Sequence, residues 1–281
     1  MEGRWKALGN KIWQARYIYL LLLPAVIFFL VFDYGPMYGL LLAFKKYNAR
    51  LGILRSEWVG LSNFRRIFIT PQAVNALINT FVISLSRLIF QFPVPILLAL
   101  LINEMPGKKL KRIYQTIYTF PHFLNWVVVA SILVNFLSTT GTVNTILSNL
   151  GMGKINFLSN PKTFRGLLYL TASWKEMGWS SIIYIAAIAG IDPTLYEAAT
   201  VDGAGRYRKI IHVTLPGITS TIIVLFILAT GRIMNAGFEQ IFNLQNPAVQ
   251  NVSDIIDTYV YTITFKGTPS YGFSTAVGMF K

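Results

Sequence analysis

Long apolar segments dominate this chain and restrict the folds open to it. Several approach the roughly 20 residues that an α-helix needs to cross about 30 Å of hydrocarbon. They cover residues 17–32 with an extension to 44, 76–102, 113–137, 164–191 and 215–236. Only 13% of the 281 residues are charged, against about 25% in soluble domains. We therefore predict an all-α integral membrane protein, a bundle of about six transmembrane helices.

The sixth helix of this bundle is expected to be incomplete. Residues 271–280 are apolar but too few to cross a bilayer. Prolines inside the other segments should bend them, with Pro93 and Pro95 kinking the second segment and Pro121 lying in the third. We expect residues 17–281 to form a single transmembrane domain.

The net charge of +14 could indicate a nucleic-acid partner. However, the basic residues lie in short stretches between apolar segments, where cationic side chains meet lipid headgroups. We therefore expect contact with the lipid bilayer and no nucleic-acid binding. The chain has no cysteine, which excludes disulfides, thiolate zinc sites and cysteine nucleophiles.

Residues 1–16 have the pattern of a helix lying in the membrane interface. Trp5, Leu8 and Ile12 follow a helical spacing, with lysines elsewhere on the helical wheel. The alternative is a frayed tail. A signal peptide is not indicated, because the apolar segment continues past Phe32 without a small-residue cleavage pattern, so we expect a retained first span.

The segment between the fourth and fifth spans, residues 192–216, is polar and rich in alanine and glycine. Asp192 can cap a helix and Pro193 suits a first helical position, so we predict a short helix over 193–202. Gly203 and Gly205 should end it, because glycine adopts left-handed backbone geometry without steric cost. Leu215-Pro216 should open the fifth span.

Such a helix-turn-helix would need a protein partner for its apolar face. Leu195, Ala198 and Ala199 share that face, and the small alanines would allow another backbone to approach closely. Glu197 would offer a carboxylate for a charge-assisted hydrogen bond, strongest to a bidentate arginine. The alternative is an ordinary connector of chance composition.

The pattern Glu197-Ala198-Ala199, then Gly203, then Val213-Thr214-Leu215-Pro216 resembles the EAA loop of permease subunits of binding-protein-dependent ABC importers. Val213 replaces the usual isoleucine. The resemblance implies a type I ABC importer permease fold and a cytoplasmic loop that inserts into an ATPase subunit. The resemblance assigns the mechanical coupling between this loop and the ATPase subunit to Glu197, Ala198, Ala199, Asp202, Gly203, Leu215 and Pro216.

The resemblance covers nearly the whole chain and favours the branch of the family that imports oligosaccharides, including the permeases for alginate and related acidic glycans. The segments that carry it are GPMYGLLLAFKKYN from Gly35, VGLSNFRRIF from Val59, YTFPHFLNWVVV from Tyr118, WKEMGWSSIIYIAAIAGIDPTLYEAA from Trp174, GFEQIF from Gly237 and DIIDTYVY from Asp254. It implies the following partners: a second homologous permease, two ATPase subunits that bind ATP and Mg²⁺, and an extracytoplasmic solute-binding protein. The implied location is a bacterial inner membrane, and the motifs do not specify which sugar is carried.

Orientation in the membrane follows mainly from this resemblance. Basic residues near span ends favour the cytoplasm. The N-terminal tail, a predicted basic hairpin at 108–112 and the stretch 206–209 share one side, but the opposite side holds a similar number of basic residues. The density of charge in the short loops and the expected place of the EAA loop favour a cytoplasmic location for the first side.

Ionisable residues inside the predicted spans are candidates for the translocation path. Arg87 and the pair Lys175-Glu176 lie about eleven residues into their spans, near mid-bilayer at about 1.5 Å per residue, and Arg232 lies in the outer part of its span. Such groups usually face the bundle interior or a water-filled cavity. Alternatively, Arg87 and Lys175 pair with Glu176, or Lys175 extends toward the interface.

On the functional interpretation these charges line a route for a sugar, and uronate carboxylates would suit the cations. Trp126 and Trp179 could serve as stacking platforms, while Glu239 and Gln240 could gate the outer mouth. The predicted path residues are Arg87, Trp126, Lys175, Glu176, Trp179, Arg232 and Glu239.

The sequence carries no sign of its own catalytic chemistry. It lacks a Gly-x-x-x-x-Gly-Lys-Ser/Thr phosphate loop, so it cannot hydrolyse ATP in the P-loop manner, and we expect no enzyme activity and no bound cofactor. His122 and His212 lack a second ligand at metal-binding spacing, and His122 is expected to pack or to hydrogen-bond. The alternatives to an ABC importer subunit are an ATP-independent secondary transporter or channel for a polar solute, and a membrane-embedded glycan enzyme.

Overall fold

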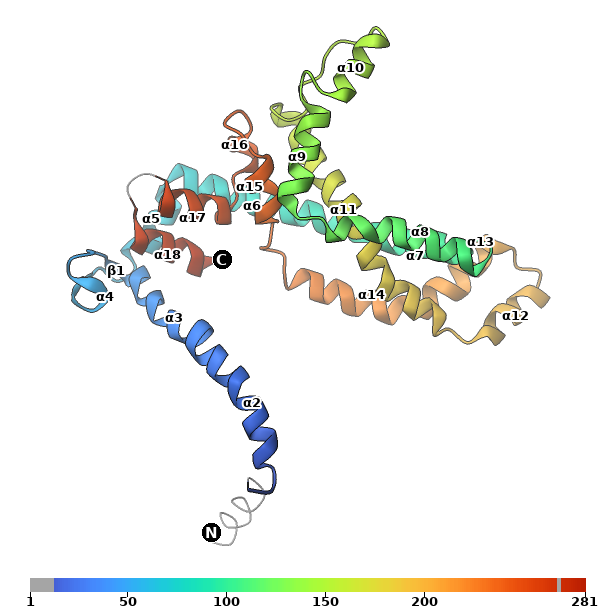
Figure 1. Ribbon diagram of the computed structural model, residues 1–281, viewed down its shortest axis with the longest axis horizontal. Helices are drawn as coiled ribbons and strands as arrows, with labels where there is room; N and C mark the ends of the chain where they lie inside the picture. The colour runs from blue at the N-terminus through green and yellow to red at the C-terminus, as the bar shows by residue number, and fades with distance from the viewer. Residues whose placement is uncertain (1–12, 267–268) are drawn as a thin grey trace. The chain divides into compact units, whose positions relative to one another are not determined.

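The computed structural model describes residues 13–266 and 269–281, and nearly all regular structure in them is helical (Figure 1). The interfacial helix expected over residues 1–16 falls mainly outside these residues. Among the described residues, four helices are long and apolar enough to cross a membrane, or up to five if one bent helix pair is a single span. The prediction of an all-α membrane protein is confirmed.

The chain divides into two compact units. The first unit consists of the residues up to Thr70 and of Val260–Lys281. The second unit consists of Pro71–Tyr259. The first span belongs to the first unit and continues to Phe44, as expected. Its elements are α2 Arg16–Phe29, η1 Leu30–Tyr34, α3 Gly35–Met37 and η2 Tyr38–Phe44.

A small hairpin and three short helices also belong to the first unit. Strand β1 (Lys45–Lys46) pairs antiparallel with β2 (Glu57–Trp58), and α4 (Gly52–Arg55) lies between them in sequence. Helix α18 (Tyr271–Phe280) packs against η2 and α5 (Ser62–Ile69). With 10 residues, α18 is too short to cross a bilayer, as predicted.

The second unit is built around the 29-residue helix α11 (Pro161–Ala189). The other elements of this unit are α6 Pro71–Gln91, α7 Pro93–Glu104, α8 Lys108–Thr119, η3 Phe120–Phe123, α9 Trp126–Leu137, α10 Thr142–Asn149, α12 Pro193–Val201, α13 Arg206–Lys209, η4 Ile210–Thr214, α14 Leu215–Thr230, α15 Phe238–Leu244 and α16 Gln250–Ser253. Helix α17 (Ile256–Phe265) begins here and continues into the first unit.

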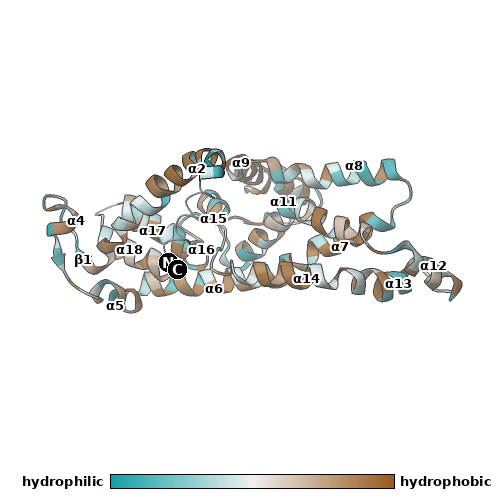
Figure 2. Ribbon diagram, turned by 90° about the horizontal axis from the view of Figure 1, so that it is seen from below, coloured by the Kyte–Doolittle hydropathy of each residue, from teal (hydrophilic) through white to brown (hydrophobic). Residues whose placement is uncertain are grey.

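Two buried apolar clusters fix these helices around α11. One contains Ile83, Phe164, Leu168 and Ile241, from α6, α11 and α15, and the other contains Leu100, Tyr184 and Ile218, from α7, α11 and α14. Large apolar side chains on the outer faces stay exposed, such as Ile227 of α14 at 61%. Figure 2 shows these apolar stretches along α6 and α14 and the hydrophilic start of α8. Exposed apolar faces are expected where lipid replaces water as the solvent.

Three expected boundaries were wrong. The third span was expected as one helix over 113–137, but the chain breaks after α8 into η3 and resumes at α9. Pro121 lacks a backbone donor, and the Asn125 side chain caps α9 by accepting a bond of 2.9 Å from the Val127 amide. The membrane-length segment is therefore Trp126–Asn149.

The basic residues 108–112 do not form a hairpin, because α8 already begins at Lys108. The fifth span begins at Arg206, and Leu215-Pro216 continues a helix rather than opening one. The π-type turn η4, just before Pro216, accommodates the missing proline donor without ending the helix. The kink expected at Pro93 and Pro95 is present as the break between α6 and α7.

Candidate functional site

Residues 192–216, which we call the elbow, turn sharply away from α11. Helix α12 is bent by 71° from α11. The Asp192 side chain caps α12 by accepting a bond of 2.9 Å from the Thr194 backbone amide. This hydrogen bond lowers the pKa of the exposed Asp192 carboxyl below its ordinary value, because it stabilises the charged form.

Glycine ends α12 as the sequence predicts, but only Gly203 does so with left-handed geometry, at φ +73°. Gly205 is extended, at φ −69° and ψ 170°, and precedes α13. Two side-chain bonds then tie the halves of the elbow together. The Lys209 Nζ donates to Thr200 Oγ1 at 2.7 Å, and the Tyr196 hydroxyl lies 3.0 Å from Thr214 Oγ1.

Several apolar side chains of the elbow are exposed, whereas such side chains are usually buried in a protein core. Val201 is 89% exposed, Tyr207 79% and Leu195 52%. Glu197 and Ala198 are exposed and Ala199 is half-buried. Within the described part of the chain, the Glu197 carboxylate makes no hydrogen bond or ion pair. The elbow therefore has an apolar face and a free carboxylate for a partner.

The other candidate residues of the elbow lie outside this exposed helix. Asp202 and Gly203 form the exposed turn after α12. Leu215 is half-buried and Pro216 exposed at the start of α14. The two are thus part of the fifth span and not of the turn.

A cavity of about 710 Å³ lies between α6, α7, α11 and α14. Among the predicted path residues it brings together Arg87, Glu176, Trp179 and Arg232. Lys175, Trp126 and Glu239 do not line it. Polar residues that the sequence did not single out also line it: Ser84, Gln91, Ser173, Ser180 and Asn235.

Arg87 does not pair with Glu176, contrary to one alternative. Its guanidinium donates a hydrogen bond to the side-chain oxygen Oε1 of Gln240, a fully buried residue of α15. The Gln240 amide group donates to the Leu168 carbonyl at 2.9 Å and to Thr171 Oγ1 at 2.8 Å. Gln240 was expected only at an outer mouth, and its motif GFEQIF gave no sign of an arginine 153 residues earlier.

Lys175 is only 5% exposed and is held by other groups. Its ammonium donates to the His122 carbonyl at 2.8 Å and to Glu176 at 3.2 Å, and lies 5.6 Å from the centre of the Trp126 ring. The contacts of Lys175 therefore match the alternative interpretation, in which Lys175 pairs with Glu176. Lys175 thus lies behind the cavity wall, and Trp126 does not line the cavity.

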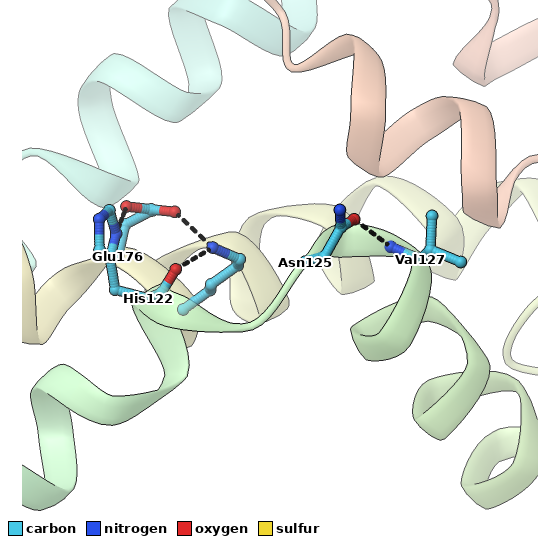
Figure 3. A network of polar contacts seen from close by, with 5 residues as sticks. His122, Asn125, Val127 and Glu176 are labelled. Atoms are coloured by element: carbon cyan, nitrogen blue, oxygen red, sulfur yellow. Dashed lines mark hydrogen bonds and ion pairs between the residues drawn. The ribbon is translucent and has the colours of Figure 1, made fainter.

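His122 connects this buried charge to the cavity. Its Nδ1 lies 2.7 Å from a carboxylate oxygen of Glu176, and its ring stacks on Trp179 with 4.7 Å between ring centres and 3° between ring planes. Figure 3 shows the His122–Glu176 contact. His122 therefore hydrogen-bonds as predicted, and it also fixes two residues that line the cavity. In the same view, the Asn125 cap on Val127 holds the start of α9 next to this network.

The remaining path candidates differ in exposure. Arg232 follows the end of α14 and is exposed toward the cavity, and its side chain makes no hydrogen bond or ion pair with the described residues. The Glu239 side chain is exposed at the start of α15. No cluster of three or more His, Asp or Glu suited to a metal ion occurs in residues 13–266 and 269–281.

The chain is similar to known transport proteins over most of its length. The family model "Binding-protein-dependent transport system inner membrane component" matches residues 93–280. The chain is 48% identical over 277 residues to the polygalacturonan/rhamnogalacturonan transport system permease protein YteP of Bacillus subtilis (strain 168), covering 98% of this chain and 86% of that protein.

Solved structures match over almost the same length. A crystal structure of a bacterial ABC transporter involved in the import of the acidic polysaccharide alginate contains a chain of 42% identity, with a TM-score of 0.90 over 98% of this chain and 92% of that chain. A second, of the bacterial alginate ABC transporter in complex with alginate pentasaccharide-bound periplasmic protein, has 42% identity and a TM-score of 0.88, over 96% of this chain and 90% of that chain.

Proposed function

This chain belongs to the family of inner membrane components of binding-protein-dependent transport systems, and from that premise we propose that it translocates an acidic oligosaccharide in an ATP-driven importer. Its partners would be a second homologous permease, two ATPase subunits that hold ATP and Mg²⁺, and an extracytoplasmic binding protein. The alginate transporter noted above, crystallised with a loaded periplasmic protein, is the precedent for that last partner.

The cavity supports an anionic sugar as the cargo. Arg87 and Arg232 both line it, and neither is paired with an acid in the described residues. Guanidinium groups bind carboxylates with two parallel hydrogen bonds and do not lose their charge. Trp179 lines the same cavity and gives a flat apolar face against which a sugar ring can stack.

The elbow would supply the coupling. Its free Glu197 carboxylate and its exposed Leu195 face are suited to a groove in the ATPase subunit, where a cationic group could meet the carboxylate. When ATP closes the ATPase dimer, the elbows of the two permeases would be drawn together. The helical units would then rock as near-rigid bodies and change access to the cavity.

The observation that carries this proposal is the unpartnered elbow at the end of a well-packed helix. The test is to co-express the chain with its ATPase and permease partners and to measure assembly and transport. We expect Glu197→Ala and Gly203→Pro to weaken both, because the first removes the free carboxylate and the second is incompatible with φ +73°. Glu57→Ala, at an exposed position of β2 in the other unit, is the matched control.

Normal assembly and normal transport in both elbow variants would rule out the docking role. An ion gradient that drives uptake without any ATPase subunit would instead favour a secondary transporter.

A further inference from the structure

We propose that Arg87 and Ser84 form a carboxylate subsite inside the cavity, and that Gln240 is the positioning residue that keeps this subsite charged. The inference rests on the proposed function, since the carboxylate would belong to the transported sugar. It goes further in naming the atoms that would bind the acid and the residue that determines their charge.

The partner of Arg87 is chemically unusual. A charge buried in a membrane protein is costly and is normally paired with an opposite charge. Arg87 is instead held by the neutral amide of Gln240, and neither of the two ion pairs found in the described residues involves it. A neutral partner orients the guanidinium without cancelling its positive charge, which stays available to a ligand.

The hydrogen-bond network fixes which way the Gln240 amide faces. The Thr171 hydroxyl donates to the Leu167 carbonyl at 2.8 Å, so its oxygen accepts the bond from Gln240. The Leu168 carbonyl can only accept as well. Both partners therefore require the Gln240 amide nitrogen, which leaves its carbonyl oxygen for Arg87.

The start of α15 is also shaped around the guanidinium. Gly237 has φ +83° and lies against Arg87, so that a Cβ at this position would collide with the guanidinium. The backbone and the Gln240 side chain thus hold Arg87 from one side.

Two buried polar atoms at this end of the cavity are left without partners. They are Arg87 Nε and Ser84 Oγ, neither of which has a hydrogen-bond partner among the described residues. Both residues line the cavity, and at three positions apart on α6 they share one face of the helix. Unsatisfied buried polar atoms are rare and call for an explanation.

A carboxylate in the cavity could satisfy both atoms. Neither atom is solvent-accessible, so the Ser84 and Arg87 side chains would have to turn toward the ligand. Each atom is attached to a hydrogen that it can donate, and an ionised carboxylate is purely an acceptor with two oxygens. Glu176, the acidic residue that lines the cavity, is not a substitute, because it is already bonded to His122 and Lys175. The ligand group that fits this subsite is therefore a carboxylate, which a transported sugar acid would supply.

The test compares two ligands of the same length that differ only at the carboxyl group, an oligogalacturonate and its methyl ester, which is uncharged. Their dissociation constants are measured by calorimetric titration of the intact permease–ATPase complex in nanodiscs. For wild type we expect tighter binding of the acid. Gln240→Glu should lower the ratio of the two affinities by about tenfold or more, equivalent to about 1.4 kcal/mol, because its carboxylate would neutralise Arg87. The substitution also removes the two bonds donated to Leu168 and Thr171, but that loss should weaken the binding of acid and ester alike and leave their ratio unchanged.

Ser84→Ala provides a second variant, since this hydroxyl has no protein partner to lose and the fold should be unaffected. We expect it to lower the same ratio, by less than Gln240→Glu. Equal weakening of acid and ester in Gln240→Glu would mean that Gln240 only supports packing, and an unchanged ratio in both variants would overturn the subsite.

The proposed function is checked separately, by uptake of the same oligogalacturonate into proteoliposomes that contain the wild-type complex and its binding protein. Uptake by wild type combined with an unchanged ratio in both variants would reject the subsite alone. Failure of wild type to take up any acidic oligosaccharide would reject the proposed cargo itself.

Discussion

Replacing Gly178 by alanine should destabilise the second unit, although alanine is the better helix former. Gly178 lies in α11 where the end of α8 crosses it, and a Cβ there would meet the backbone of Tyr118 and Thr119. It would lie 2.6 Å from the Thr119 amide nitrogen and closer still to the Tyr118 carbonyl. Non-bonded heavy atoms pack at about 3.5–4.0 Å, so the backbone would have to move by about 1 Å.

Gly166 supplies the matched control. It lies in the same helix, and a Cβ there would meet nothing within 4 Å. Both substitutions gain about 0.5–1 kcal/mol of helix propensity, and only Gly178→Ala also incurs the overpacking cost of about 1–3 kcal/mol. The difference in unfolding free energy between the variants should therefore be about 1–3 kcal/mol.

Thermal unfolding of the purified complex in nanodiscs, followed by tryptophan fluorescence, would measure this difference. About 2–4 °C in Tm is expected per kcal/mol for a unit of this size. The displacement would also move η3 away from α11, and with it the His122 ring that stacks on Trp179. If Gly178→Ala unfolds at the same temperature as Gly166→Ala or above it, the close helix crossing is refuted.

Three further changes test other parts of the structure. Gly203→Ala should destabilise the elbow by about 1–2 kcal/mol, because residue 203 has a left-handed backbone conformation. Protease cleavage after Arg206 should then become faster, and an unchanged cleavage rate would contradict the predicted destabilisation. Lowering the pH through the depressed pKa of Asp192 should loosen the start of α12. The ionised carboxyl contributes its full stabilisation above the pKa of the unfolded chain and loses it as the pH falls through the lower pKa of the folded protein. Hydrogen exchange of the Thr194 amide would measure this loosening, and in Asp192→Asn the same pH step should have no effect. Arg232→Gln should weaken stimulation of ATPase activity by an acidic oligosaccharide more than by a neutral one, whereas Lys175→Gln should weaken both equally, because Lys175 lies behind the cavity wall. A charge-selective effect of Lys175→Gln would place it in the path after all.

Local signals in the sequence were sufficient for several features. Segment length and apolar composition gave the all-α membrane fold, because a bilayer leaves the backbone few other ways to satisfy its hydrogen bonds. Asp192-Pro193 and Gly203 gave the short helix of the elbow and its end, because caps and left-handed glycines act over a few residues. Periodicity could not show that the third span breaks at Pro121, because a proline and the Asn125 cap set the break and the spacing of apolar residues does not report either of them.

Which charges share a cavity was decided only by the tertiary structure. Arg87 and Lys175 look equivalent in sequence, each a cation in the middle of an apolar segment, yet one lines the cavity and the other is enclosed by His122 and Glu176. The difference arises because Gln240 meets Arg87 across 153 residues of chain. Composition and periodicity determine that a residue lies within the membrane. Packing between distant helices determines what it faces there, because each partner lies on a different helix and only the packed unit brings them within bonding distance.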